Sequence, residues 1–163
     1  MQNREHIKAQ SSLELLITVS FGLVILLPIV VFAFIQLSTS SSTLSATEAQ
    51  AVANKLATIA SEIGVQGYPA KQLVLIQMPP NVQGIYVGNY TSNMLNGYGH
   101  EIIITIETTS GISYITAYTP INVSGYLGSI VSQGTYLVNV SALNSCPGHT
   151  YEPCVYISQS NYS

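Results

Sequence analysis

One uninterrupted apolar segment restricts the folds open to this chain. Residues 15–35 include no charged side chain, and as an α-helix these 21 residues would extend about 30 Å, the thickness of the hydrocarbon core of a bilayer. Arg4 and Lys8 precede the segment, which predicts that the N-terminus stays in the cytoplasm while the rest of the chain crosses the membrane. The segment is also longer than the apolar core of an ordinary secretory signal.

Two simpler interpretations of this segment stay open at this point. Ala49-Gln50-Ala51 resembles a secretory cleavage site, although it lies well beyond the apolar residues. An uncleaved membrane anchor would need no cleavage site at all. Each leaves a different N-terminus on the exported protein.

The aromatic residues divide the chain into two regions. All three Phe residues lie in the apolar segment, whereas all eleven Tyr residues lie at or beyond Tyr68. Phe suits lipid or a dry helix bundle, and Tyr suits half-exposed strands and surfaces. The charged residues amount to only 7%, far below the ~25% of typical soluble domains. The sequence therefore predicts two environments in one chain.

A polar motif stands directly before the apolar segment. Lys8 and Ala9 are followed by Gln10, Ser12 and Glu14 at alternating positions. This arrangement resembles the class III signal peptide of archaeal type IV pilin-like proteins, and the resemblance covers residues 8–35. It implies that a membrane-embedded prepilin peptidase recognises Lys8, Gln10, Ser12 and Glu14 and cuts between Ala9 and Gln10. The apolar helix would then remain on the mature protein.

The resemblance also implies an organisation for the whole chain. A leader (residues 1–9) precedes an apolar membrane or filament-core helix (10–37), an amphipathic extension (38–64) and an extracellular β-rich head (65–163). The precursor would lie in the cytoplasmic membrane with its N-terminus inside, and the mature form would lie in a cell-surface filament that serves adhesion. Its partners would be copies of itself, the prepilin peptidase, the membrane, and a pilus assembly ATPase with its membrane platform.

Three other functions fit the same features. A minor pilin or pseudopilin would start or tip a filament without forming its bulk, and an archaellin-type subunit would serve motility. A single-pass membrane-anchored binding module would never polymerise.

Glu14 and Pro28 are the candidate assembly residues. Ser11 and Glu14 fit the S-x-x-E capping box, in which Glu14 bonds back to the N–H of Ser11 at a helix start. In a filament, Glu14 would instead pair with the N-terminal amine of a neighbouring subunit and set the axial register. Pro28 removes one helical hydrogen bond, so a kink or local unwinding is expected there. The resemblance implies that the helix loosens near such a proline on assembly.

The helical pattern continues beyond the apolar segment. Residues 38–43 are all Ser or Thr and could form a hinge, an O-glycosylated collar or an exposed helical turn. Beyond them an apolar stripe recurs in steps of three and four, and Gly64 is expected to end the helix. The stripe, which we expect to pack against the head, comprises Ala49, Val52, Leu56, Ile59 and Ile63.

The head is rich in Gly, Tyr and β-branched residues. Strands are predicted at residues 72–77, 84–87, 100–108, 112–118, 134–140 and 155–158. Ile102, Ile104 and Ile106 alternate with Ile103, Thr105 and Glu107, as in a half-buried strand, and residues 109–111 suggest a hairpin turn. The predicted fold class is α+β, in which a long N-terminal helix packs against a small antiparallel head, the "lollipop" arrangement of pilins.

Cys146 and Cys154 are the only cysteines and are predicted to form a disulfide, which implies an oxidising compartment. Two reduced thiols are an alternative. A zinc site that adds His149 is a weaker one, because CxxC spacing is missing.

Four sequons make N-glycosylation of the head plausible, at Asn89, Asn122, Asn139 and Asn161. Asn139 is predicted to point outward, opposite Tyr136, Val138 and Val140.

The sequence offers no catalytic motif. His6 lies in the leader, and the neighbours His100 and Glu101 would point to opposite faces of a strand. Asp is missing, G-x-S-x-G does not occur, and the net charge is −3. We therefore expect no enzyme activity, no cofactor or metal, and no nucleic-acid partner.

Overall fold

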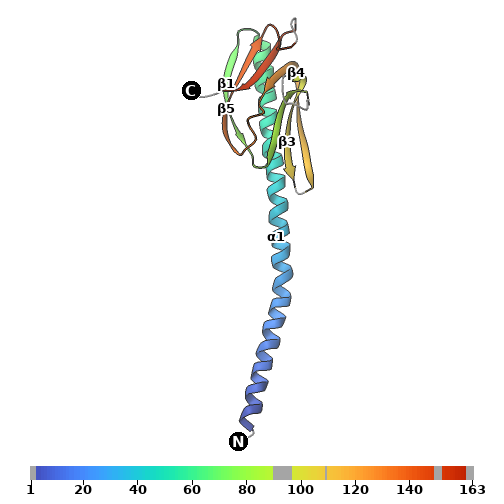
Figure 1. Ribbon diagram of the computed structural model, residues 1–163, viewed down its shortest axis with the longest axis vertical. Helices are drawn as coiled ribbons and strands as arrows, with labels where there is room; N and C mark the ends of the chain where they lie inside the picture. Colours follow the sequence, from blue (N-terminus) through green and yellow to red (C-terminus); the bar gives the residue numbers. More distant parts are fainter. Residues whose placement is uncertain (1–2, 90–96, 109, 149–151, 161–163) are drawn as a thin grey trace. The chain divides into compact units, whose positions relative to one another are not determined.

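The computed structural model describes the chain except for residues 1–2, 90–96, 109, 149–151 and 161–163, and of residues 3–12 it describes only the backbone. Among the described residues, a single helix is followed by six strands (Figure 1). The helix α1 covers Asn3–Gln66, and the strands are β1 (Lys71–Met78), β2 (Val82–Gly88), β3 (Gly97–Thr108), β4 (Gly111–Tyr126), β5 (Gly134–Leu143) and β6 (Cys154–Gln159). These elements confirm the predicted α+β fold class.

The chain forms two compact units, residues 1–41 and residues 42–163. In the first unit every described residue belongs to α1, and the helix continues through Pro28. The hydroxyl of Thr18 donates to the carbonyl oxygen of Glu14 at 2.7 Å, and that of Thr39 donates to the carbonyl oxygen of Ile35 at 3.0 Å. Hydroxyl groups are thus satisfied within the helix. The Ser/Thr run 38–43 is helical and mostly exposed, which agrees with the exposed helical turn among its predicted alternatives.

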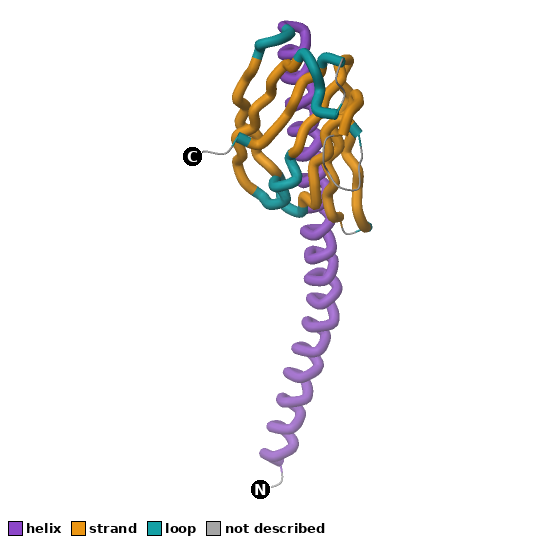
Figure 2. The backbone as a smooth tube through the Cα atoms, turned by 45° about the horizontal axis from the view of Figure 1, so that its top comes forward, coloured by secondary structure: helices purple, strands orange, loops and turns teal. Residues whose placement is uncertain are grey.

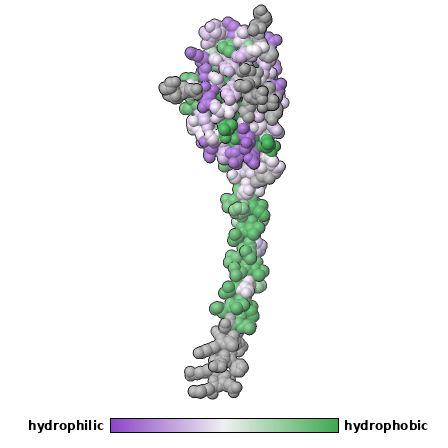
Figure 3. Space-filling model, viewed as in Figure 1, coloured by the Kyte–Doolittle hydropathy of each residue, from purple (hydrophilic) through white to green (hydrophobic). Residues whose placement is uncertain are grey.

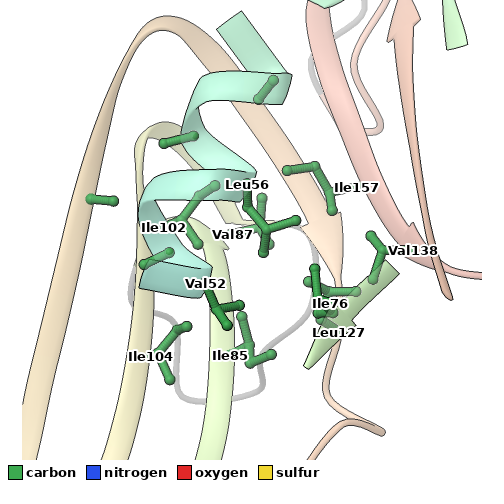
Figure 4. Packing of buried hydrophobic residues seen from close by; sticks show 14 of the residues in the cluster. Val52, Leu56, Ile76, Ile85, Val87, Ile102, Ile104, Leu127, Val138 and Ile157 are labelled. Carbon is green, nitrogen blue, oxygen red and sulfur yellow. The ribbon is translucent and has the colours of Figure 1, made fainter. Parts of the chain in front are cut away.

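In the second unit, the C-terminal segment of α1 packs against the sheet (Figure 2). The predicted stripe is confirmed: Ala49, Val52, Leu56 and Ile63 are buried, and Ile59 is partly buried. The buried face is wider than the stripe, since it also includes Ala53, Ala57 and Ala60. Alanines allow a helix backbone to approach the strands closely. Figure 4 shows Val52 and Leu56 in one apolar cluster with side chains of the strands.

The helix ends two residues later than expected. Gly64 was predicted to end it, but α1 continues to Gln66, and Gly67 adopts the left-handed conformation with φ 70°. The N–H of Gly67 donates to the carbonyl oxygen of Ile63 at 3.1 Å, which is the αL capping motif. Gly64 has a different role, because a Cβ there would clash with the side chain of Ile121. Its missing side chain lets β4 approach the helix.

The six strands form one sheet in the order β1-β5-β6-β4-β3-β2. All six predicted strands are present, and each is longer than predicted. The expectation of a purely antiparallel sheet is wrong at one place, since β4 and β6 pair in parallel, with Val123 opposite Val155. After β5 the chain turns back and inserts β6 between β4 and β5, and this insertion makes β6 run parallel to β4.

The hairpin between β3 and β4 lies where the sequence predicted it. Thr108 is paired with Gly111, and the Thr108 hydroxyl donates to the carbonyl oxygen of Gly111 at 2.7 Å. Gly111 has φ 121°, which glycine adopts without strain. Residue 109 lies outside the described residues, so the turn is defined by its two ends.

The alternation expected in β3 holds on one face only. Ile102, Ile104 and Ile106 are completely buried toward the helix, as predicted. Ile103 and Thr105 on the other face were expected to be exposed, yet they are 7% and 4% exposed. Their cross-strand neighbours explain this, because Ile103 pairs with Tyr86 and Thr105 pairs with Tyr114. Large tyrosine side chains beside them cover the outer face at this point.

Candidate functional site

Between residues 13 and 37 the helix presents an apolar surface on all sides. We call residues 13–37 the apolar rod. Its large aliphatic and aromatic side chains are between 47% and 75% exposed, from Ile25 to Phe34. Figure 3 shows this surface as a nearly unbroken apolar column. Soluble proteins rarely expose a continuous apolar surface of this extent without a partner for it. The helix is long and apolar enough to span a membrane.

The predicted peptidase motif lies within α1 rather than before it. Lys8, Ala9, Gln10 and Ser12 are helical, and their side chains lie outside the described residues. The capping-box prediction for Ser11 is wrong for the chain as it stands, because the helix begins at Asn3. A residue eight positions into a helix has its N–H bonded to the carbonyl four residues earlier and needs no cap.

Glu14 lies at the N-terminal border of the apolar rod and is exposed. It is the only charged residue between Leu13 and Leu37, where Thr18, Ser20 and Gln36 are the other polar residues. At this border the carboxylate can be solvated by water or contact a lipid headgroup. Inside a bundle of such rods it would need a positive partner.

Pro28 lies near the middle of the apolar rod. Because proline has no N–H, the carbonyl of Val24 lacks its helical donor. The local unwinding that was one of two expected outcomes is absent from the described helix, which is continuous on both sides of Pro28. The missing hydrogen bond weakens the helix at this turn.

The head contains the predicted disulfide. Cys146 and Cys154 are bonded and both are buried, which excludes the reduced thiols and the zinc site as alternatives. His149 lies outside the described residues, and no cluster of metal-binding side chains occurs among the residues that are described. The N–H of Cys146 also donates to the carbonyl oxygen of Glu152 at 3.0 Å. These bonds tie the start of β6 to the segment that follows β5.

Tyr98 of β3 lies close to Glu152 of the disulfide-closed segment, a proximity that sequence reasoning missed. Hydrogen bonding with the carboxylate of Glu152 raises the pKa of the Tyr98 phenol, and burial raises it further. A hydrogen bond with the amide of Asn122 lowers the same pKa and partly offsets this rise. The three residues are far apart in sequence, so no local pattern indicates that they meet.

The sequons differ in accessibility. Asn89 is exposed, and Asn139 is half-buried on the face opposite the buried Val138 and Val140, as predicted. Asn161 lies outside the described residues. The sequon of Asn122 depends on the hydroxyl of Ser124, which is completely buried and has no hydrogen-bond partner among the described residues.

Comparison of the chain with known protein families, curated proteins and solved structures finds no match. Its function has to be argued from its own residues.

Proposed function

We propose that this chain is the precursor of a structural subunit of an extracellular type IV pilus-like filament, which assembles through the apolar rod. One observation carries the proposal: the rod is apolar all round, yet it belongs to the same helix whose C-terminal segment completes the core of a disulfide-bonded head. A helix that is apolar on every side needs lipid or other helices around it.

Maturation begins with removal of the leader. The prepilin peptidase recognises Lys8, Gln10, Ser12 and Glu14 and cuts between Ala9 and Gln10. Removal of residues 1–9 takes away Arg4 and Lys8, the only Arg or Lys before the rod. The loss of these two side chains lowers the cost of pulling the helix out of the membrane, because each charged side chain at the bilayer centre costs about 2.5–3.5 kcal/mol.

Assembly exchanges one apolar environment for another. In the membrane the rod contacts lipid, and in the filament it contacts the rods of other subunits. Since both surroundings are apolar, the hydrophobic effect favours neither strongly. The direction is then set by the assembly ATPase with its membrane platform and by contacts between subunits.

The head forms the outer surface of the filament. It is outside the cell, where a disulfide between Cys146 and Cys154 persists. Exposed tyrosines on the sheet, such as Tyr114 and Tyr118, suit contact with surfaces and other cells. Adhesion is therefore the role we assign to the filament. A minor pilin or an archaellin-type subunit would share the same helix and differ in abundance or in the machine that it serves.

A different class, the single-pass anchored binding module, is supported by the same rod, because lipid alone can cover it. The N-terminus of the exported protein separates the two. Expression of the full chain with an archaeal prepilin peptidase, assembly ATPase and membrane platform, followed by N-terminal sequencing and electron microscopy of the cell surface, should give Gln10 as the first residue together with filaments. An intact leader, or a protein cut before Gln10 that stays monomeric in the bilayer, would reject the filament proposal.

A further inference from the structure

A pocket of about 380 Å³ lies in the head at the C-terminal end of α1. We call it the head pocket. Its walls come from Gly64 and Gly67 of the helix end and from residues of β3, β4, β5 and β6 with their connections. The volume lies within the range of about 300–1,000 Å³ that is usual for small-molecule sites. The whole pocket belongs to residues 64–155, and thus to the second compact unit.

The walls of the head pocket are held by well-packed regions of the head. Gly64 and Ile121 are in close contact where β4 meets the helix. The disulfide fixes Cys154, another wall residue, to the segment that follows β5. A site whose walls are fixed before binding loses little entropy when a ligand enters.

The lining of the head pocket is polar but carries no full charge. Hydrogen-bonding groups come from the side chains of His100, Asn122 and Asn144, and from the phenol of Tyr68. Two prolines, Pro120 and Pro153, and aliphatic side chains supply apolar walls. The ring of Tyr68 is 62% exposed, so it is accessible from solvent. Lys, Arg and Glu do not occur among the residues that line the pocket.

The polar, uncharged lining restricts the kinds of ligand that the head pocket can bind. Without a cationic side chain the pocket has no group to attract a phosphate or carboxylate, and without a carboxylate it has none to attract a cation. A purely apolar ligand would offer no hydrogen-bonding group to His100 and Asn144. A neutral ligand with many hydroxyl groups and one apolar face satisfies both kinds of wall.

We propose that the head pocket binds a neutral saccharide. The C–H face of a pyranose ring packs on the ring of Tyr68 and the prolines. Its hydroxyl groups pair with the amides of Asn122 and Asn144, each of which offers donors and an acceptor, and with the imidazole of His100. An extended peptide fits less well, because it would bind by adding a strand to a sheet edge. The edges of this sheet are β1 and β2, and neither lines the pocket.

The proposal does not rest on the assignment as a filament subunit, since an anchored monomer would carry the same pocket. The test uses the full chain in a detergent without a sugar headgroup, because a maltoside would compete. Saturation-transfer NMR is recorded with methyl mannoside, galactose and N-acetylglucosamine, with glucuronate as the charged probe and trialanine as the peptide probe. We expect saturation of the ring protons of at least one neutral sugar and none of glucuronate or trialanine.

Variants then locate the contact. Tyr68→Ala should weaken binding of that sugar by at least about tenfold, whereas Tyr68→Phe, which keeps the ring, should weaken it far less. Tyr114→Ala is the matched control, because Tyr114 is 57% exposed on β4 and does not line the pocket. Asn144→Ala should weaken binding without changing the circular dichroism of the head. The proposal is overturned if no neutral sugar binds, if only glucuronate or trialanine binds, or if Tyr68→Ala and Tyr114→Ala bind equally well.

Discussion

The ammonium group of Lys55 donates a hydrogen bond to the backbone carbonyl oxygen of Leu75 at 2.7 Å. Lys55 belongs to α1 and Leu75 to β1, an edge strand of the sheet. The bond therefore occupies one of the acceptors that an edge strand leaves open to pairing with another chain, and it also links the helix to the strand. Protection of an edge by lysine is a common device against aggregation.

Replacement of this lysine should weaken the head and open its edge. Lys55→Met removes the donor but keeps the aliphatic stem, so we expect the free energy of unfolding to fall by about 1 kcal/mol and the chain to self-associate more readily. Unfolding in urea and light scattering measure the two effects. Lys71→Met, at the start of the same strand, removes an equal charge and serves as the control. Equal behaviour of the two variants would mean that the bond to Leu75 contributes nothing.

Gly125 lies where β4 and β6 run in parallel, opposite Ile157. A Cβ at this position would overlap the backbone carbonyl oxygen of Ile157, which cannot move without breaking the sheet. We therefore expect Gly125→Ala to lower the free energy of unfolding by about 2–3 kcal/mol. The comparison is Gly134→Ala, because a Cβ there would meet the ring of Tyr136 at an ordinary 3.5 Å. Thermal unfolding of both variants should show a large loss for the first and little change for the second.

Local sequence patterns predicted the helix, the six strands and the disulfide because each depends on neighbouring residues. The apolar run, the spacing of Val52 and Leu56, and the alternating isoleucines of β3 are signals of this kind. What they missed depends on contacts between distant residues. Gly64 was predicted to end the helix because glycine is common at helix ends, yet its role is close packing with Ile121.

Three further features were also beyond local reasoning. The parallel pairing of β4 with β6 follows from strand order, which no single segment encodes. Burial of Ile103 follows from a tyrosine on the neighbouring strand. The head pocket is assembled from the ends of several elements, so only the folded chain shows that Tyr68, His100 and Asn144 line one space.

The contact between Tyr98 and Glu152 makes the stability of the head depend on pH. The pKa of Tyr98 is raised in the folded chain, so the folded state holds this proton more tightly than the unfolded state, in which the pKa is about 10. The stabilising contribution is thus complete below pH ~10 and is lost as the pH rises through the folded-state pKa. Melting temperatures measured from neutral pH upward should begin to fall there. Tyr98→Phe should be less stable at neutral pH and show a shallower fall at high pH; a fall as steep as that of the wild type would assign the effect to other groups.

The sequons should not be used equally. Asn89 is exposed and Asn139 is half-buried on the outer face, whereas the sequon of Asn122 includes a completely buried hydroxyl at Ser124. Expression in a host that performs N-glycosylation, followed by glycopeptide mass spectrometry, should find glycans at Asn89 or Asn139 and none at Asn122. Asn122→Gln should leave the glycan mass unchanged. A glycan on Asn122 would mean that modification precedes folding of β4.

Glu14 provides the sharpest test of the filament proposal. Cleavage before Gln10 creates an ammonium group four residues from Glu14, at a border where all further large side chains as far as Ile35 are apolar. When rods pack together, a carboxylate without a partner would be buried at a penalty of several kcal/mol, and pairing with the ammonium group of a neighbouring subunit offsets that penalty. The pair also fixes how far one rod slides along the next, because only one register brings the two charges together.

Glu14→Ala should still be cut at the normal site, because Lys8, Gln10 and Ser12 remain for recognition by the peptidase. It should yield few filaments, since the ammonium group loses its partner. Glu14→Gln, which keeps the shape and removes the charge, should fail in the same way, and this distinguishes charge pairing from simple packing. Glu48→Ala changes an exposed carboxylate on the second unit and should assemble normally. Immunoblotting against the leader measures processing, and electron microscopy of sheared cells measures assembly. Wild-type numbers of filaments from Glu14→Gln would show that the charge has no role in register, and uncut precursor would show that the peptidase cannot act without Glu14.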